Sequence, residues 1–551
     1  MNAKHLLFWP LMLLLLMVSC ARQETATPGS WDFSPVPRDL TVLTGNDFVV
    51  GPETVICCPE DLREQAALLA ELMEPVIGRK LTAESGTHVI ALRLDPYLGT
   101  GLKDFQQREC YRLNITREEV TLTGATPVGI LRGMQTLVKA LPVSLGRGAV
   151  AVLPGGEVFD YPEYEYRAFL LDCGRHFFPL PTVKKVIDIL ALHQLNAFHW
   201  HLTEDQGWRL EIKRYPRLTE VGSRRDGSPV EGQEGHDGVP VSGYYTQDEV
   251  REVVAYAAAR GIEVIPEIDM PGHMKAALAS YPELGCTGGP YEVACEWGVL
   301  DDVLCVGKDS SLAFVMNVLD EVMDLFPSRY IHLGGDECPK VRWETCPHCQ
   351  ARIHALGLET RGAMTAEELL QSWFLDRVAE RVEARGRRVI VWNDALVGWD
   401  NIVSGAPSKQ TVIAGWMRPV SSEIAVREGY DAIICPVGHL YLSAAEGNRL
   451  TGEDYLRRVY DLPVPPPSLS EPERERILGV ETCLWTERVD NEDLLLWEML
   501  PRLSAVAELQ WSDPASRDFS AFLPRIARMD SLYTACGWRW NSAGPENLSH
   551  P

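Results

Sequence analysis

Strand-like and helix-like segments alternate from about residue 163 to residue 510, and this repeat constrains the fold more than any other feature. Continuous apolar runs of five to eight residues are typical of parallel strands that are buried on both faces. Eight such runs occur here: Ala168–Cys173, Ala197–Leu202, Ile262–Ile268, Tyr330–Gly334, Arg388–Trp392, Thr411–Trp416, Ala432–Pro436 and Leu478–Trp485. Eight parallel strands with helical crossovers predict an α/β fold, a closed (β/α)₈ TIM barrel.

Longer segments with a 3.6-residue apolar period lie between several of these runs or follow the last one, and they are predicted as helices. They are Pro181–Gln194, Gln247–Arg260, Ser310–Phe326, Ala366–Arg385, Ser421–Glu428 and Leu494–Leu509. Residues 511–551 are predicted as a further helix, Asp518–Leu532, and a polar tail.

Residues 35–160 have a different pattern, which predicts a small α+β domain before the barrel. Its predicted helices are Asp61–Ile77 and Val128–Leu141. Its predicted strands are Phe48–Cys57, His88–Leu94, Cys110–Ile115 and Glu119–Leu122. A chain of 551 residues is long enough for two or three units, and no catalytic motif falls in this one.

The first 20 residues are predicted to be a targeting segment. Lys4 and His5 precede the apolar run Leu11–Val18, and Ser19-Cys20 follows it. This order resembles a bacterial lipoprotein signal, in which Cys20 is lipidated and residues 21–34 form a polar tether. We therefore expect an exported, membrane-anchored protein of the bacterial periplasm or cell surface. A cleaved secretory signal without a lipid is the alternative.

The net charge and the cysteine spacing indicate which macromolecules and metals this chain is expected to bind. A formal net charge of −25 excludes nucleic acid as an expected partner, because such partners call for basic patches. The pair Cys346-Pro-His-Cys349, with Cys338 nearby, has the spacing of half a zinc site. Zinc sites usually show a second pair, so we expect a disulfide or free thiols here, with no metal and no cofactor. Nothing in the sequence specifies an oligomeric state.

Polar and aromatic residues follow every predicted barrel strand. Active sites of such barrels lie at the carboxyl ends of the strands, so these side chains are expected to converge. In chain order they are Arg175, His201, Glu204, Asp269, His273, Asp336, Glu337, Trp392, Asp394, Trp416, Tyr441, Trp485 and Glu487.

The segment His332-Leu-Gly-Gly-Asp336-Glu337 carries the sharpest chemical signal. Two adjacent carboxyl groups in one enclosed site cannot both ionise comfortably, so one is expected to stay protonated and the other charged. That state suits cleavage of an acetal, where an acid protonates the leaving oxygen and a negative charge supports the cationic transition state. The alternative is a solvated acidic turn or a helix amino end that attracts acidic residues.

Adjacent acids are poorly placed for the ordinary retaining mechanism, which needs carboxyls about 5 Å apart on opposite sides of the scissile bond. A 2-acetamido group on the sugar can instead act as the nucleophile. In that scheme Asp336 orients the acetamido N–H, and Glu337 is first the acid and then the base.

Four segments now make a resemblance specific: Leu171–His176, His199–Arg209, Pro266–His273 and His332–Glu337. In order and spacing they resemble family 20 glycoside hydrolases, the β-N-acetylhexosaminidases, over about residues 35 to 510. The resemblance implies an exo-acting hydrolase that removes terminal, non-reducing N-acetylglucosamine or N-acetylgalactosamine from a glycan with retention, by substrate-assisted catalysis.

The resemblance also implies roles for single residues. Arg175 and Glu487 bind the sugar hydroxyls, while Glu204 and His273 tune the acid Glu337. The aromatic residues surround the acetamido group, three as walls and the tyrosine as a hydroxyl donor to the acetamido oxygen: Trp392, Trp416, Trp485 and Tyr441.

Two positions depart from the family pattern. Glu204 stands where many relatives carry aspartate, which changes its reach but not its charge. Ser443 stands where many relatives carry an aspartate that contacts the 4-hydroxyl, so the preference between the two epimeric sugars is open.

Two other functional classes compete. His199-Trp-His201, with His273, His332 and Asp336, could hold zinc in a metal-dependent amidohydrolase. A surface glycan-binding lipoprotein would also carry an anchor and many tryptophans, but binding alone needs no paired acid.

Overall fold

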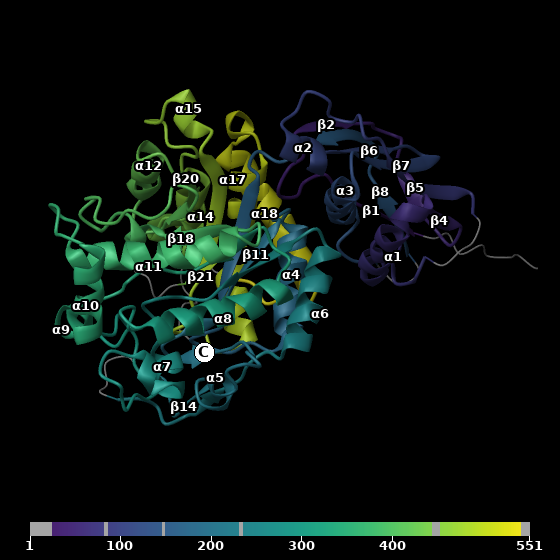
Figure 1. Ribbon diagram of the computed structural model, residues 1–551. Coiled ribbons are helices and arrows are strands. Elements are labelled where there is room, and N and C mark those ends of the chain that lie inside the picture. Colours follow the sequence, from purple (N-terminus) through teal and green to yellow (C-terminus); the bar gives the residue numbers. More distant parts are fainter. Residues whose placement is uncertain (1–24, 82–85, 146–148, 231–234, 444–451, 542–551) are drawn as a thin grey trace, which may run out of the picture.

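The computed structural model describes residues 25–81, 86–145, 149–230, 235–443 and 452–541. The predicted signal segment with Cys20 lies outside these residues. Figure 1 shows a small domain, coloured purple and blue, beside a larger body that contains the barrel.

Eight strands close the barrel, each parallel to its neighbours and in chain order around the ring. They are β10 (Tyr166–Asp172), β11 (Ala197–His201), β16 (Glu263–Glu267), β17 (Tyr330–His332), β18 (Arg388–Trp392), β19 (Val412–Gly415), β20 (Asp431–Ile434) and β21 (Ile477–Leu484). Each coincides with one predicted apolar run to within two residues at either end, and the predicted TIM barrel is confirmed.

Helices surround the barrel where the 3.6-residue period predicts them. They are α4 (Leu180–Leu192), α6 (Gln247–Ala258), α8 (Asp309–Leu325), α11 (Ala366–Glu383) and α12 (Pro419–Arg427). Local chemistry sets their starts. Thr246 accepts the Glu249 N–H while Glu249 reaches back to Thr246, a capping box that begins α6.

The segment Leu494–Leu509, predicted as one helix, is two. Helix α16 (Glu492–Met499) ends before Pro501, and α17 (Arg502–Trp511) begins after it. Proline lacks the N–H that a continuous helix would need at this position, so the single-helix prediction is wrong.

Shorter elements complete the body. They are β12 (Thr203–Glu204), β13 (Gly207–Trp208), α5 (Arg217–Glu220), β14 (Arg224–Arg225), β15 (Val241–Ser242), α7 (Lys275–Ser280), η2 (Pro282–Leu284), α9 (Val341–Thr345), α10 (Pro347–Leu356), η3 (Asn393–Ala395), α13 (Val437–Leu440), α14 (Gly452–Tyr460), α15 (Glu471–Arg474), η5 (Pro514–Ser516) and α18 (Phe519–Ala535). Helix α18 is the predicted carboxyl-terminal helix, and Arg528 on it donates to the backbone oxygens of Lys139 and Leu141 in the small domain.

The small domain has a six-stranded sheet in the order β2-β9-β6-β7-β5-β4 and a three-stranded sheet β1-β8-β3. Its helices α1 (Arg63–Ile77) and α3 (Pro127–Ala140) match the predicted ones closely, and α2 (Asp104–Glu109) is additional. The strands are β1 (Thr25–Pro28), β2 (Asp39–Val42), β3 (Phe48–Val50), β4 (Thr54–Cys57), β5 (His88–Leu94), β6 (Tyr111–Ile115), β7 (Glu119–Gly124), β8 (Ala149–Leu153) and β9 (Gly156–Asp160).

Two predictions about this domain need correction. The run Phe48–Cys57 is two strands in different sheets, because Gly51-Pro52 interrupts it. Residues 25–34 are not a tether: Thr25–Pro28 pairs with β8, and Trp31 and Phe33 are buried in the core. Burial of two aromatic rings outweighs the polar character of the surrounding residues.

A buried charge cluster joins the two domains. Glu109 of the small domain accepts from Arg132 of α3 at 2.8 Å and pairs with Arg167 of strand β10. Burial alone would raise the pKa of Glu109, but the two guanidinium groups lower it to about 2. Arg132 also donates to backbone oxygens of Leu195 and Gly261 in the barrel body.

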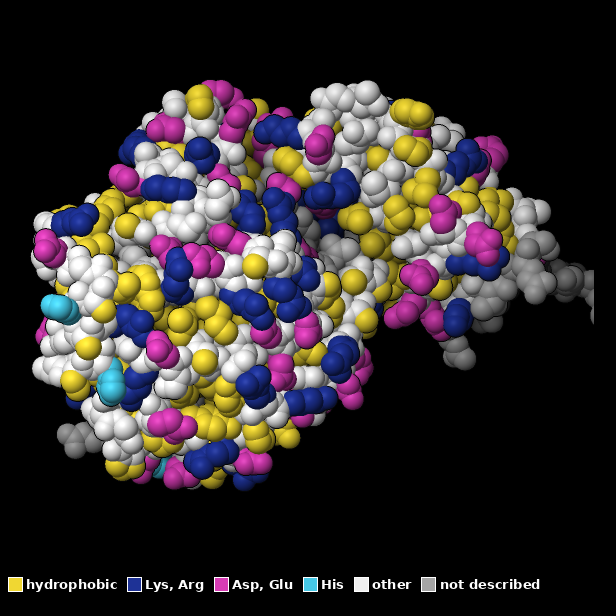
Figure 2. Space-filling view, in the orientation of Figure 1, with side chains coloured by type: hydrophobic (Ala, Val, Ile, Leu, Met, Phe, Trp, Pro, Cys, Tyr) yellow, Lys and Arg dark blue, Asp and Glu magenta, His cyan; other side chains and the backbone are white. Residues whose placement is uncertain are grey.

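The surface carries both signs of charge. Figure 2 shows Lys and Arg side chains interspersed with Asp and Glu on the visible face, without one continuous basic patch. Within the described part of the chain, no helix has the length and apolar character needed to cross a bilayer.

Candidate active site

Arg175 enters the carboxyl end of the barrel from the turn after β10. The Asp172 carboxylate holds this turn, because Oδ1 accepts the N–H groups of Gly174 at 2.8 Å and Arg175 at 3.1 Å. The guanidinium group then reaches Glu204, with Nη2 2.8 Å from Oε1, and lies 5.0 Å from the Trp485 ring centroid. Glu487 lies further out, with Oε1 3.9 Å from Arg175 Nε.

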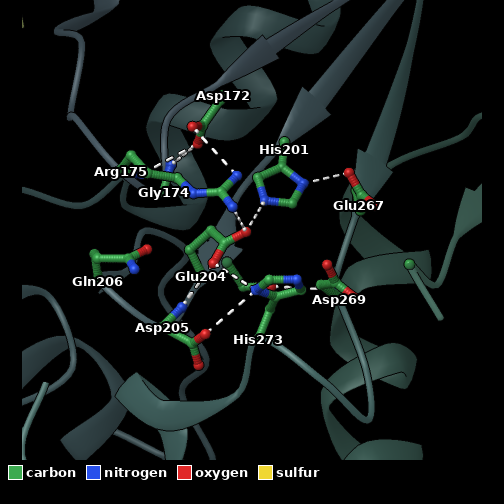
Figure 3. A network of polar contacts seen from close by, with 12 residues as sticks. Asp172, Gly174, Arg175, His201, Glu204, Asp205, Gln206, Glu267, Asp269 and His273 are labelled. Atoms are coloured by element: carbon green, nitrogen blue, oxygen red, sulfur yellow. Dashed lines mark hydrogen bonds and ion pairs between the residues drawn. The ribbon is translucent and has the colours of Figure 1, made fainter. Parts of the chain in front are cut away.

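Glu204 is the centre of a buried network of charges (Figure 3). Its Oε1 also contacts His201 Nε2 at 3.2 Å, and its Oε2 lies 3.1 Å from His273 Nδ1. Burial would raise the pKa of Glu204, yet Arg175 and His273 hold it well below its ordinary value. Glu204 is therefore a fixed anion that joins the sugar-facing arginine to the histidine.

His273 lies between this network and the acidic pair. Its Nδ1 faces Glu204 and Asp205, the latter at 3.2 Å, and its Nε2 lies 3.5 Å from Glu337 Oε2 and 3.8 Å from Asp336 Oδ2. Burial lowers the pKa of His273, but the carboxylates of Glu204 and Asp205 raise it well above its ordinary value. The imidazole is therefore a cation that holds both members of the pair.

A glycine turn brings Asp336 and Glu337 to the same side. Gly334 and Gly335 have φ angles of 67° and 89°, and a Cβ on Gly334 would lie 1.7 Å from Asp269 Oδ1. Glu337 follows with φ 43°, and His273 has φ 51°, so both residues are in the left-handed region that favours glycine. The turn lets two consecutive side chains approach one imidazole, which an extended strand would not allow.

Burial changes the acidity of Asp336 within this pair. Asp336 is 9% exposed, and burial raises its pKa to about 8, with Asp394 and Glu337 adding repulsion and His273 opposing it. This raised pKa agrees in direction with the expectation that two adjacent acids do not both ionise freely in one enclosed site.

Asp394 supports the pair from η3, the turn that follows strand β18. Its Oδ1 accepts the Glu337 N–H at 3.2 Å, and its Oδ2 accepts the Trp416 indole N–H at 2.7 Å. Burial raises the pKa of Asp394 to about 6, although the two donated hydrogen bonds lower it.

The four aromatic residues predicted for the site pack in one buried cluster, at or after the ends of strands β18 to β21. They are Trp392, Trp416, Tyr441 and Trp485. Ring centroids of Trp392 and Trp485 are 6.0 Å apart, those of Tyr441 and Trp485 6.0 Å, and the stacked rings of Trp416 and Tyr441 6.2 Å. Trp392 donates its indole N–H to Glu267 at 2.8 Å. The cluster supplies an apolar wall beside the acidic pair.

The contacts therefore connect all ten predicted active-site residues. From Arg175 they lead through Glu204 and His273 to the acidic pair, then through Asp394 to the aromatic cluster, and through Trp485 back to Arg175. Glu487 is attached at the rim, and Ser443 is buried beyond Tyr441.

Two family models match the chain, and the residues they match coincide with the barrel and the small domain. "Glycosyl hydrolase family 20, catalytic domain" matches residues 164–514, and "Glycosyl hydrolase family 20, domain 2" matches residues 32–161. The chain belongs to glycosyl hydrolase family 20.

Individual relatives agree with this family. A beta-hexosaminidase of Porphyromonas gingivalis is 38% identical over 504 residues, covering 89% of this chain and 62% of that protein. One of Vibrio furnissii is 36% identical, covering 86% of this chain and 75% of that protein. The chain thus spans less than two thirds of the Porphyromonas protein.

Solved structures match as well. A GH20 exo beta-N-acetylglucosaminidase from Vibrio harveyi, in complex with N-acetylglucosamine, has a TM-score of 0.80 and 29% identity, covering 96% of this chain and 81% of that chain. The beta-N-acetylhexosaminidase from Bacteroides fragilis has a TM-score of 0.76 and 31% identity, covering 94% and 99%.

The family 20 site also accounts for the histidines that suggested an amidohydrolase. His199 faces Glu481 at 2.9 Å and Glu267 at 3.2 Å, while His201 faces Glu267 and Glu204. Burial lowers both pKa values, but the carboxylates raise that of His199 to about 9 and that of His201 well above its ordinary value. In the fold these two side chains are hydrogen-bonded to the neighbouring carboxylates of Glu481, Glu267 and Glu204.

Three further acidic residues of the site are not among the residues expected to converge. Asp205 shares His273 with Glu204, Glu267 accepts from Trp392 inside the barrel, and Asp172 fixes the Arg175 turn. Asp205 and Asp172 lie inside the family segments, and that position was the signal available. Glu267 also lies inside a family segment, Pro266–His273, but at the end of a strand, where only the fold shows which side chains it meets.

Proposed function

We propose that this chain is an exo-acting β-N-acetylhexosaminidase that removes terminal N-acetylglucosamine or N-acetylgalactosamine from glycans with retention. Family membership and the names of the relatives support the substrate class. The acetamido group of the substrate acts as the nucleophile.

One observation carries this proposal. Asp336 Oδ1 is buried, yet it accepts no hydrogen bond from any residue that the structure describes. A buried acceptor without a donor costs free energy, on the order of 1–3 kcal/mol, until a ligand supplies one. An acetamido N–H is such a donor, and the aromatic cluster next to Asp336 suits the acetamido methyl group.

The first half of the reaction forms a ring. Asp336 holds the acetamido N–H, so that the acetamido carbonyl oxygen points at the anomeric carbon. That oxygen bonds to the carbon while the glycosidic C–O bond breaks, and Glu337 gives its proton to the departing oxygen. The resulting oxazolinium cation lies against the anionic Asp336.

The second half reverses these roles. Glu337, now a carboxylate, takes a proton from water, and the water oxygen bonds to the anomeric carbon on the face that the leaving group vacated. The ring opens and the acetamido group is restored. Two displacements at one carbon give overall retention.

Substrate binding also favours the anionic form of Asp336. In the free enzyme, burial raises the pKa of Asp336 to about 8. An acetamido N–H donated to Asp336 stabilises its anionic form and lowers its pKa. Glu337 is the proton donor in this scheme, and His273 Nε2 lies 3.5 Å from its Oε2.

Chromogenic substrates test the proposal. We expect turnover of the β-N-acetylglucosaminide and the β-N-acetylgalactosaminide, no turnover of the matching plain β-glucoside, and strong inhibition by a thiazoline mimic of the cyclised intermediate. NMR of the first product anomer should show the β configuration. Comparable hydrolysis of the plain glucoside would contradict acetamido participation.

The two epimeric sugars should be hydrolysed at similar rates. Ser443 is buried, and within the described residues its Oγ has no hydrogen-bond partner. A serine offers no charge to the 4-hydroxyl, and a hydrogen bond to a charged group contributes about 1.5–3 kcal/mol. We therefore expect a ratio of kcat/KM values within about tenfold, since one uncharged contact is worth about 1 kcal/mol.

We also propose export and lipid anchoring through Cys20, in the periplasm or at the cell surface. The charged start, the apolar run and Ser19-Cys20 support it. Labelled palmitate should be incorporated into the wild-type chain in bacterial cells and not into Cys20→Ala. Equal labelling of both would contradict the assignment.

A further inference from the structure

Four cysteine side chains converge in a region apart from the acidic pair. Cys286, Cys305, Cys346 and Cys349 have all four sulfur atoms within 4.8 Å of one another. Cys305 Sγ lies 3.6 Å from Cys346 Sγ and 3.7 Å from Cys349 Sγ, and Cys286 Sγ lies 3.9 Å from Cys349 Sγ. Three of the four are buried and Cys286 is half-buried.

These separations match the edges of a tetrahedron around a metal. Zinc–sulfur bonds of about 2.3 Å place the sulfur atoms of a tetrahedral site about 3.8 Å apart. A disulfide would require a separation of about 2.05 Å, and no disulfide joins any cysteine that the structure describes.

Two chain segments build the cluster in the way that zinc sites are built. Cys346 precedes helix α10 and Cys349 lies in its first turn, where free backbone N–H groups stabilise thiolates. Cys286 and Cys305 lie beside a two-residue bridge between Gly285 and Leu304. The fold thus supplies the second pair that the sequence spacing does not reveal, while Cys338 is not a member.

Packing leaves little room for the cluster to rearrange. A Cβ on Gly307 would lie 2.3 Å from the Cys349 backbone nitrogen, so the segment after Cys305 lies directly against α10. The Trp343 indole donates to the Leu304 oxygen at 3.0 Å and ties the two segments together again. Fixed sulfur positions favour a preformed tetrahedral site over two disulfides, which would need each pair to close by more than 1 Å.

We propose that these four thiolates bind one structural zinc ion. Tetrahedral coordination by four sulfurs is typical of zinc or of iron, and a closed four-protein-ligand site is structural rather than catalytic. This inference does not rest on the proposed hydrolase activity.

The zinc ion would also position part of the active site. The segment 286–305 is held at both ends by the cluster. Its Ala294 N–H donates to the backbone oxygen of Asp205 at 3.0 Å, and the backbone oxygen of Glu296 accepts from Gln206 Nε2 at 2.7 Å. Asp205 in turn contacts His273. Cys286 and Cys305 thus act as positioning residues, through the backbone that flanks the Glu204 network.

Metal analysis of the full chain tests the proposal. We expect about one zinc per chain by plasma mass spectrometry in the wild type, less than a tenth of that in Cys349→Ser, and an unchanged content in Cys295→Ser. Cys295 is the matched control, because it lies in the same segment but outside the cluster. Stoichiometric iron, or zinc retained by Cys349→Ser, would overturn the assignment.

Two measurements on the wild type keep the test independent of variant folding. Cobalt exchanged into the protein should give the intense visible bands of tetrahedral thiolate coordination. Denaturation with chelator should release four additional reactive thiols. Silent cobalt spectra, or the absence of those thiols because they are disulfide-bonded, would also overturn it.

Discussion

Two of the buried charge clusters in the described part of the chain differ sharply, one between the domains and one at the carboxyl end of the barrel. At the interface, Glu109 meets two guanidinium groups, and its pKa is lowered to about 2. At the barrel end, Asp336 and Asp394 are buried among other acids, and their pKa values are raised to about 8 and about 6.

The contrast separates structural from catalytic charges. In the interface cluster each charge has a partner, and among the described residues no buried polar side-chain atom of Glu109, Arg132 or Arg167 lacks a hydrogen bond. The barrel-end cluster has surplus acid and an acceptor oxygen without a donor. Buried groups whose pKa values move toward neutrality are able to transfer protons at physiological pH, whereas those moved away from it are fixed.

The largest effect is expected at the acid itself. Glu337→Gln should reduce kcat about 100- to 10,000-fold, because an amide cannot protonate the leaving group. Turnover of a chromogenic N-acetylglucosaminide measures it, and Glu252→Gln, an exposed glutamate on helix α6, is the control. Wild-type turnover in Glu337→Gln would place the acid elsewhere.

The neighbouring acid should matter nearly as much. Asp336→Asn should lower kcat on N-acetyl substrates on the order of 100- to 1,000-fold, because the amide cannot stabilise the cyclised cation. The comparison with Glu337→Gln is most informative with an activated leaving group, which needs little protonation. We expect such a substrate to restore the turnover of Glu337→Gln but not that of Asp336→Asn. Restored turnover in both variants would contradict the separate roles assigned to the two acids.

The interface cluster should affect stability and leave catalysis alone. Glu109→Gln removes the carboxylate that neutralises the buried guanidinium groups of Arg132 and Arg167. It should therefore destabilise the fold by about 3–5 kcal/mol. Thermal unfolding measures it. The control Glu119→Gln breaks only the exposed pair with Arg93 and should cost at most about 1 kcal/mol.

The same cluster predicts an acid limit to stability. The pKa of Glu109 is lowered in the fold to about 2, from about 4.3 in the unfolded chain. Its contribution is therefore complete above the unfolded value and is lost as the pH falls toward 2. A stability difference between wild type and Glu109→Gln that persists unchanged at pH 2 would contradict this.

The smallest expected effect is a pH profile. The pair must carry one proton, so kcat/KM should fall about tenfold per pH unit above about 8, as Asp336 loses it. Below about 6, protonation of Asp394 weakens its hold on Trp416 and Glu337, and activity should fall again. Asp336→Asn should move the alkaline limb, and an unmoved limb would assign that proton to another group.

The barrel and most of the site could be predicted because their signals are local. Apolar runs and helical periods set strand and helix positions, and the carboxyl ends of parallel strands must meet at one edge. The adjacent acids and the glycines before them lie in one short segment, so their convergence could be expected before the fold was known.

The remaining contacts depend on residues far apart in the chain. Cys286 and Cys305 are 60 and 41 residues before Cys346, and no spacing rule connects them. Nor does the sequence show that Trp31 and Phe33 are buried, because only the neighbouring sheet makes an apolar site for them. The raised pKa of Asp336 also depends on burial, which is a property of the folded chain.

Glu337 and His273 have a left-handed backbone that lowers the stability of the fold, yet their side chains are needed for catalysis. Each non-glycine residue in that conformation costs about 1–2 kcal/mol. Glu337→Gly should therefore match or exceed the wild type in melting temperature while being inert as a hydrolase. Directed evolution that selects for thermal stability alone would therefore favour inactive variants of this kind. A screen for a more stable enzyme must also select for product formation in every round.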